Sequence, residues 1–112
     1  MSSYATKLDP VPLLNTLINK TQAGKLKLDE TAVEDIFLVS VGGNTTLKVR
    51  EKVNPDGDYY YHTLSLLDEN GKLIWEIEEP SVLIEQLFVL ARRVARKVDE
   101  RVEALMGTLQ KL

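Results

Sequence analysis

Apolar residues recur at spacings of three and four near both ends of the chain, whereas they alternate with polar residues in between. The first periodic segment predicts a helix over residues 10–23, because Asp9 is a preferred N-cap and Gly24 stands where a left-handed residue ends a helix. The second predicts a long helix over residues 81–106, ended by Gly107. Its apolar positions form one ridge: Leu83, Leu87, Leu90, Val94, Val98, Val102, Leu105 and Leu109.

Four segments between the helices have the alternation and the β-branched or aromatic side chains typical of strands. We expect these strands over residues 35–41, 45–53, 59–67 and 72–78. Short turns that contain glycine separate them, so neighbouring strands run antiparallel and form a meander. Residues 25–34 precede them as a linker with one short extended piece. The sequence therefore predicts an α+β fold, a four-stranded antiparallel sheet with a short N-terminal and a long C-terminal helix packed mainly on one face.

The long helix is expected to extend beyond this sheet. Roughly 26 helical residues span about 39 Å, whereas strands of six to eight residues span about 20–27 Å. The far end of the apolar ridge is then left without cover, which is uncommon in a monomer. We therefore expect a homodimer that forms through the C-terminal helix. The interface candidates are the apolar Val98, Val102, Leu105 and Leu109 and the cations Arg93, Lys97 and Arg101, spaced at i, i+4 and i+8.

Charge is unevenly distributed along the chain, although the net charge of the 112 residues is only −3. Residues 68–85 are mainly acidic and residues 86–112 mainly basic. In an antiparallel pair of copies the acids of one would lie near the arginines of the other, and such pairs orient docking more than they strengthen it. The acids concerned are Glu76, Glu78, Glu79 and Glu85.

The composition, 44% hydrophobic and 28% charged, predicts a single folded domain over residues 1–112. The chain has no cysteine and one histidine, so we expect no disulfide, no metal site and no cofactor. We find neither a signal-peptide pattern nor an apolar run long enough to span a membrane, and therefore expect a cytoplasmic protein.

The order of elements resembles an uncharacterised bacterial family of small domains with a helix, a four-stranded meander and a second helix. The resemblance rests on Leu17, Thr21 and Gly24-Lys25 in the first helix and its end, Tyr60 and residues 67–74 in the sheet, and Leu87 with Ala91-Arg92 in the second helix. It implies the α+β architecture and a bacterial origin, and it supplies no activity.

His62 is the only imidazole and the first candidate for catalysis. Alternation places it on the same strand face as Tyr60, Leu64 and Leu66, so we expect a buried, hydrogen-bonded structural histidine. No serine lies in a nucleophile-elbow sequence. We therefore predict that the protein is not an enzyme, and a small ligand-binding domain around His62 is an open alternative.

The outer face of the sheet provides another alternative. Lys48, Arg50 and Lys52 alternate along one strand beside Tyr59 and Tyr61 of the next, an arrangement suited to stacking single-stranded bases. The acids of the last strand share this face and would repel phosphates. We therefore predict a non-catalytic protein-interaction module, with a single-stranded nucleic-acid-binding module as the alternative.

Overall fold

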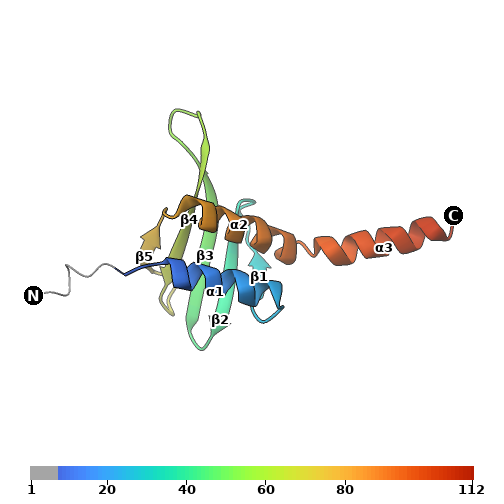
Figure 1. The fold of residues 1–112 in the computed structure, drawn as a ribbon, viewed down its shortest axis with the longest axis horizontal. Helices are drawn as coiled ribbons and strands as arrows, with labels where there is room; N and C mark the ends of the chain where they lie inside the picture. The colour runs from blue at the N-terminus through green and yellow to red at the C-terminus, as the bar shows by residue number, and fades with distance from the viewer. Residues whose placement is uncertain (1–7) are drawn as a thin grey trace, which may run out of the picture.

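The computed structural model describes residues 8–112. Figure 1 shows an antiparallel sheet, two helices against it and a third helix that extends away. The predicted α+β class is confirmed, and no predicted strand end is off by more than one residue. The elements are α1 (Val11–Gln22), β1 (Lys27–Glu30), β2 (Ile36–Gly42), β3 (Thr45–Val53), β4 (Tyr60–Leu67), β5 (Leu73–Ile77), α2 (Ser81–Ala95) and α3 (Val98–Gln110).

The sheet has five strands in the order β1-β2-β3-β4-β5, so the predicted count of four is wrong by one. The additional strand, β1, lies within the predicted linker 25–34. Leu28 pairs with Val39 and packs against the core, while the other three residues of β1 are charged. Charged side chains are common on edge strands because they discourage pairing with another chain. The same charges weakened the strand pattern in the sequence.

Both α1 and α2 cover one face of the sheet (Figure 1). α2 contacts β1 to β4 directly, and α1 lies beside α2. Where the layers meet, the rings of Phe37 and Phe88 contact edge to face at 5.6 Å between centroids. The core comprises Leu14, Leu17, Phe37, Val39, Leu47, Val49, Leu64, Ile84, Leu87, Phe88 and Ala91.

The sheet's last strand departs from its expected alternation. A register shift between Leu66 and Leu67 interrupts the β4–β5 ladder. Alternation along residues 72–78 would place Leu73 on the core side together with Trp75 and Ile77. Leu73 is nevertheless 57% exposed at this irregularity, whereas Ile77 packs against the core. Leu73 therefore does not belong to the core.

The first helix begins at Val11, with Pro10 as its N-cap. The prediction that Asp9 is the N-cap is therefore wrong. Its Oδ1 nevertheless accepts a hydrogen bond from the Val11 N–H at 3.0 Å and so satisfies a free donor at this end of the helix. The predicted end is confirmed, since Gly24 has a φ of 72° just after the helix.

The predicted single helix over 81–106 is wrong. α2 ends at Ala95 and α3 begins at Val98, and Lys97 between them adopts the left-handed conformation, with φ 54° and ψ 44°. Gly107 does not end a helix either, because α3 continues to Gln110. No glycine or proline occurs at the break, so the sequence contains no local signal for it.

Candidate functional site

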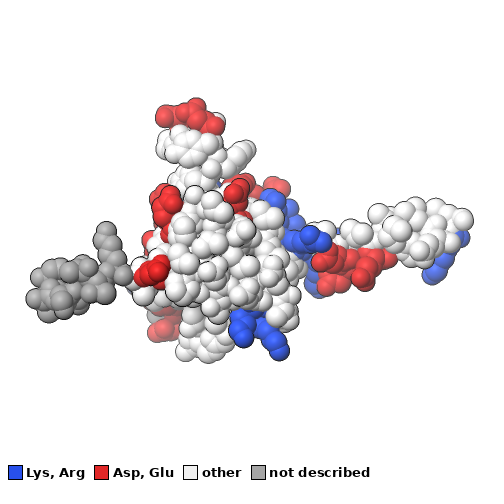
Figure 2. All heavy atoms as spheres, in the orientation of Figure 1, with Lys and Arg blue, Asp and Glu red and all other residues white. Residues whose placement is uncertain are grey.

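α3 extends into solvent from the body of the protein, which we define as residues 8–97 (Figures 1 and 2). No residue of α3 is buried by the rest of the described chain. Spacings of four, three and four place Val98, Val102, Leu105 and Leu109 on one side of the helix, as in the seam of a coiled coil. Their exposed fractions run from 36% at Val98 to 56% at Leu105. The structure thus unites these four predicted interface residues, which we call the α3 ridge.

The predicted cations of the interface are arranged differently. Arg93 spans the break, because its Nη2 and Nε donate to Asp99 Oδ1 at 2.6 and 3.1 Å. This hydrogen bond, and then the charge of the Asp99 carboxylate, raises the pKa of Arg93. Arg101 Nε donates back to the carbonyl oxygen of Arg96 at 2.8 Å. Arg93, Lys97 and Arg101 therefore form no continuous helical stripe, because the left-handed residue changes the direction of the chain.

Arg96 fastens the end of α2 to the sheet. Its Nε lies 3.7 Å from Glu30 Oε2 and its Nη2 donates to the Glu34 carbonyl oxygen at 3.1 Å. The guanidinium also lies 5.4 Å from the centroid of the Phe37 ring, a cation–π distance. Figure 2 shows cations gathered at this end of the body and acids at the start of α3. The contacts of Arg96 with Glu30, Glu34 and Phe37 are the last ones along the chain that join α2 to the sheet.

The outer face of the sheet brings together all five residues of the nucleic-acid alternative. Lys48, Arg50 and Lys52 occupy alternate positions along β3, and Tyr61 pairs with Lys52 across the β3–β4 ladder. The rings of Tyr59 and Tyr61 lie 6.5 Å apart between centroids.

The same face also contains a carboxylate, Glu76, on the edge strand β5. Glu76 Oε2 accepts a hydrogen bond from Ser65 Oγ at 2.7 Å, and Glu76 Oε1 lies 4.0 Å from Lys52 Nζ. Within residues 8–112 this leaves Lys48 and Arg50 as the two cations of the row without a carboxylate partner. Affinity for nucleic acid rises with the number of phosphates neutralised, so the face offers little for that function.

His62 lies on the core side of β4, as its alternation predicts, and is 8% exposed. Its ring lies 4.8 Å from that of Phe88, and its Nε2 is 3.0 Å from Glu51 Oε2. An ionised carboxylate only accepts, so Nε2 is the nitrogen that donates. The imidazole is therefore buried and hydrogen-bonded.

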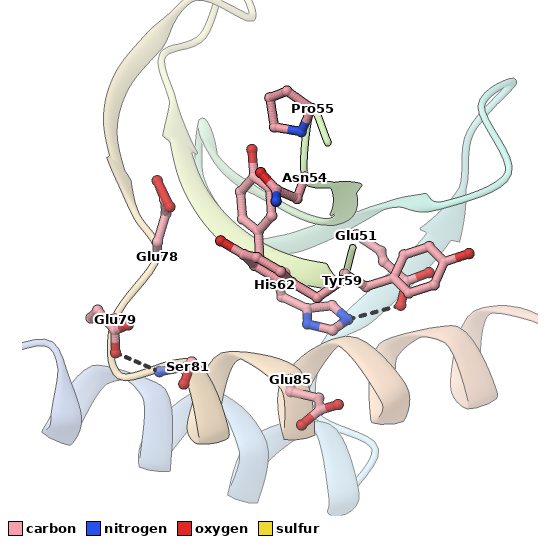
Figure 3. Close-up of a pocket in the computed structure, with 11 residues that line it drawn as sticks. Glu51, Asn54, Pro55, Tyr59, His62, Glu78, Glu79, Ser81 and Glu85 are labelled. Carbon is pink, nitrogen blue, oxygen red and sulfur yellow. Dashed lines mark hydrogen bonds and ion pairs between the residues drawn. The ribbon is translucent and has the colours of Figure 1, made fainter. Parts of the chain in front are cut away.

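A pocket of about 660 Å³ opens beside His62 (Figure 3). Its walls are the start of β4, the segment after β5 and the start of α2. β5 pairs with β4 only along Leu64–Leu67, so the two strands separate toward this end. The residues that line the pocket are Glu51, Asn54, Pro55, Tyr59, Tyr60, Tyr61, His62, Glu78, Glu79, Ser81 and Glu85.

Sequence reasoning found His62 but missed the carboxylates around it. Glu51, Glu78 and Glu85 come from three separate segments, and only the folded sheet brings them together. The exposed Met106, which lies between Leu105 and Leu109 of the α3 ridge, was also missed, although its position in an amphipathic helix was visible in the sequence.

Two further expectations concern whole classes of site. In the part of the chain that the structure describes, no three histidine, cysteine, aspartate or glutamate side chains are grouped closely enough to hold a metal ion. Nor does any described helix have the length and apolar character needed to cross a membrane.

Comparisons with known proteins found no relative. No family model matches the chain, and neither the curated proteins nor the solved structures contain a match. The resemblance to a bacterial family of small domains therefore stays a prediction, and the function has to be argued from the molecule itself.

Proposed function

We propose that this protein is a non-catalytic interaction module that pairs with a second copy of itself through α3. The observation that supports this proposal is the α3 ridge, an apolar seam that the rest of the described chain leaves uncovered. A solitary helix of 13 residues is marginal in water even with favourable sequences. A partner that covers the ridge would stabilise it.

The charges of α3 favour a second copy in antiparallel orientation. In its first half Asp99, Glu100 and Glu103 outnumber Arg101, so this half is net acidic, whereas Lys111 follows its last turn. Antiparallel pairing brings the lysine of each copy toward the acids of the other, and parallel pairing brings acids together. Like charges placed together disfavour the parallel arrangement.

The same charges argue against a lipid surface as the occupant. Helices that lie on membranes are rich in lysine and arginine on their polar side. α3 and the residues just after it contain three acids, one arginine and one lysine. An anionic bilayer would repel this helix, so protein is the better partner for the ridge.

The apolar area of α3 suits a weak dimer. Full burial of a leucine or valine side chain is worth about 1.5–3 kcal/mol, and the ridge residues are about half exposed. Covering the exposed half of four such residues on each copy gives about 6–12 kcal/mol in total, against a cost of association of roughly 4–15 kcal/mol. The two are comparable, so we expect a weak dimer whose dissociation constant lies above the micromolar range.

Analytical ultracentrifugation over a range of concentrations tests the proposal. The intact chain is expected to reach twice its 12.6 kDa mass. Leu105→Glu should remain monomeric, because it places a charge in the seam. Ala104→Glu is the matched control, with the same new side chain at a neighbouring exposed position off the ridge, and it should still dimerise. A monomeric intact chain, or equal behaviour of the two variants, contradicts the proposal.

A further inference from the structure

The pocket beside His62 is lined by carboxylates and by uncharged side chains. Four of its lining residues are glutamates, three are tyrosines, and none is lysine or arginine. At about 660 Å³ it lies within the range of about 300–1,000 Å³ typical of small-molecule sites. This combination of charge and shape selects a positively charged ligand.

His62 offers the pocket a hydrogen-bond acceptor. The imidazole is nine-tenths buried and uses Nε2 for Glu51. Its Nδ1 has no hydrogen-bond partner among the described residues, and Figure 3 shows this side of the ring facing the start of α2 near Ser81. In the neutral imidazole with a proton on Nε2, Nδ1 is an acceptor. A ligand N–H would satisfy it.

The tyrosines add a second kind of attraction. Tyr59 and Tyr60 are well exposed at the mouth of the pocket, each above half of its full accessibility. Aromatic faces attract organic cations through their negative π surface, and a weaker attraction of this kind operates at exposed sites as well. An arrangement of aromatic rings and carboxylates is typical of sites for ammonium and guanidinium groups.

A metal ion fits this pocket less well. The carboxylates surround the space without converging, since no group of three metal-binding side chains occurs among residues 8–112. A metal ion needs its ligands at about 2.0–2.6 Å, whereas an organic cation can be held by acids several ångströms further apart. The spacing therefore distinguishes the two classes of cation.

We propose that this pocket binds an organic cation with N–H donors, an alkylammonium group. Glu79 and Glu85 attract the charge, Tyr59 and Tyr60 cover its apolar part, and His62 accepts one N–H. The site is separate from α3, so it does not depend on the dimer.

Heteronuclear NMR titration of the intact chain at low salt and mildly alkaline pH tests this proposal. The probes are cadaverine, as a free amine, and N-acetyl-lysine methylamide, as a lysine side chain in a peptide. We expect saturable shifts at His62 and Tyr60 with at least one probe. Tighter binding of cadaverine would indicate a free amine as the natural ligand, and tighter binding of N-acetyl-lysine methylamide would indicate a lysine side chain of a protein. Glutamate and Mg²⁺ should cause no saturable shifts at these residues.

Variants at exposed acids localise the binding without disturbing the fold. Glu79→Gln and Glu85→Gln are each expected to weaken it about threefold, as for a partly exposed ion pair. Glu69→Gln, in the turn before β5, removes the same charge outside the pocket and should leave the affinity unchanged. Absence of binding to both amines, tighter binding of Mg²⁺, or an equal effect of Glu69→Gln overturns the proposal.

Discussion

α2 and α3 are consecutive helices of similar length, 15 and 13 residues, with opposite surroundings. α2 buries Ile84, Leu87, Phe88 and Ala91 against the sheet. α3 has its own apolar side but buries no residue within the described chain. Of the ridge expected from the sequence only Leu87 is buried in the core, whereas Val94 is 38% exposed and the ridge residues of α3 are available to a partner. A periodic pattern shows that a helix has an apolar side and leaves open what covers it.

Large-to-small substitutions should separate the two helices most clearly. Phe88→Ala should lower the free energy of unfolding by about 3–5 kcal/mol, because its ring is fully buried against Phe37 and His62. Leu105→Ala should cost far less, since the body does not cover that side chain. Urea denaturation of both variants, at a protein concentration low enough to keep the chain monomeric, measures the difference.

Equal losses of stability in Phe88→Ala and Leu105→Ala would contradict the difference in burial between α2 and α3. They would mean that Leu105 packs against the body, contrary to its exposure in the structure. Val102→Ala serves as a second α3 variant, so that the comparison does not depend on one position.

Removal of α3 should have the next largest effect. It should abolish association of two copies and leave the fold of the body unchanged. A chain that ends at Lys97 retains the whole core and the Arg96 contacts, so it should fold with the β-sheet signal of the intact protein in circular dichroism. We expect it to be monomeric in analytical ultracentrifugation at every concentration tested. Loss of the folded body would show that α3 contributes to the core after all.

The sequence predicted most of the fold because its signals are local. Turn residues such as Gly42 and Gly43 separate alternating strands, and both have positive φ in the structure. β1 was missed because an edge strand needs few apolar residues. The break at Lys97 was missed because nothing in the residues around it opposes a helix, and the contacts of Arg96 and Asp99 that accompany it are tertiary or span the turn.

The functional surfaces were predictable to different degrees. The α3 ridge follows from helical periodicity, and the burial of His62 follows from strand alternation. The pocket follows from neither, because Glu51 lies on β3 and Glu85 on α2. The space between them also depends on the separation of β5 from β4 beyond Leu64, a property of the sheet that no short window of sequence expresses.

The last contacts of the body should have a measurable but smaller effect. Arg96→Ala removes the ion pair with Glu30, the hydrogen bond to Glu34 and the contact with Phe37. Because the guanidinium is about one-third exposed, we expect a loss of only about 1 kcal/mol in urea denaturation. Arg93→Ala is the control, since its ion pair with Asp99 lies in solvent and should leave the midpoint unchanged. Similar losses in the two variants would show that the body does not end at Arg96.

The smallest expected effect concerns the residue that separates the helices. Lys97 has a positive φ, which costs a residue with a Cβ atom about 1 kcal/mol. Lys97→Gly removes this cost but adds freedom to the unfolded chain, so the net gain in stability should be only about 0.5 kcal/mol. Lys97→Val should be destabilising, because a β-branched residue tolerates this conformation poorly. Urea denaturation at one fixed protein concentration compares them. Opposite signs at a single position support the left-handed break, whereas a destabilising glycine together with a tolerated valine would indicate that α2 and α3 join as one helix in solution.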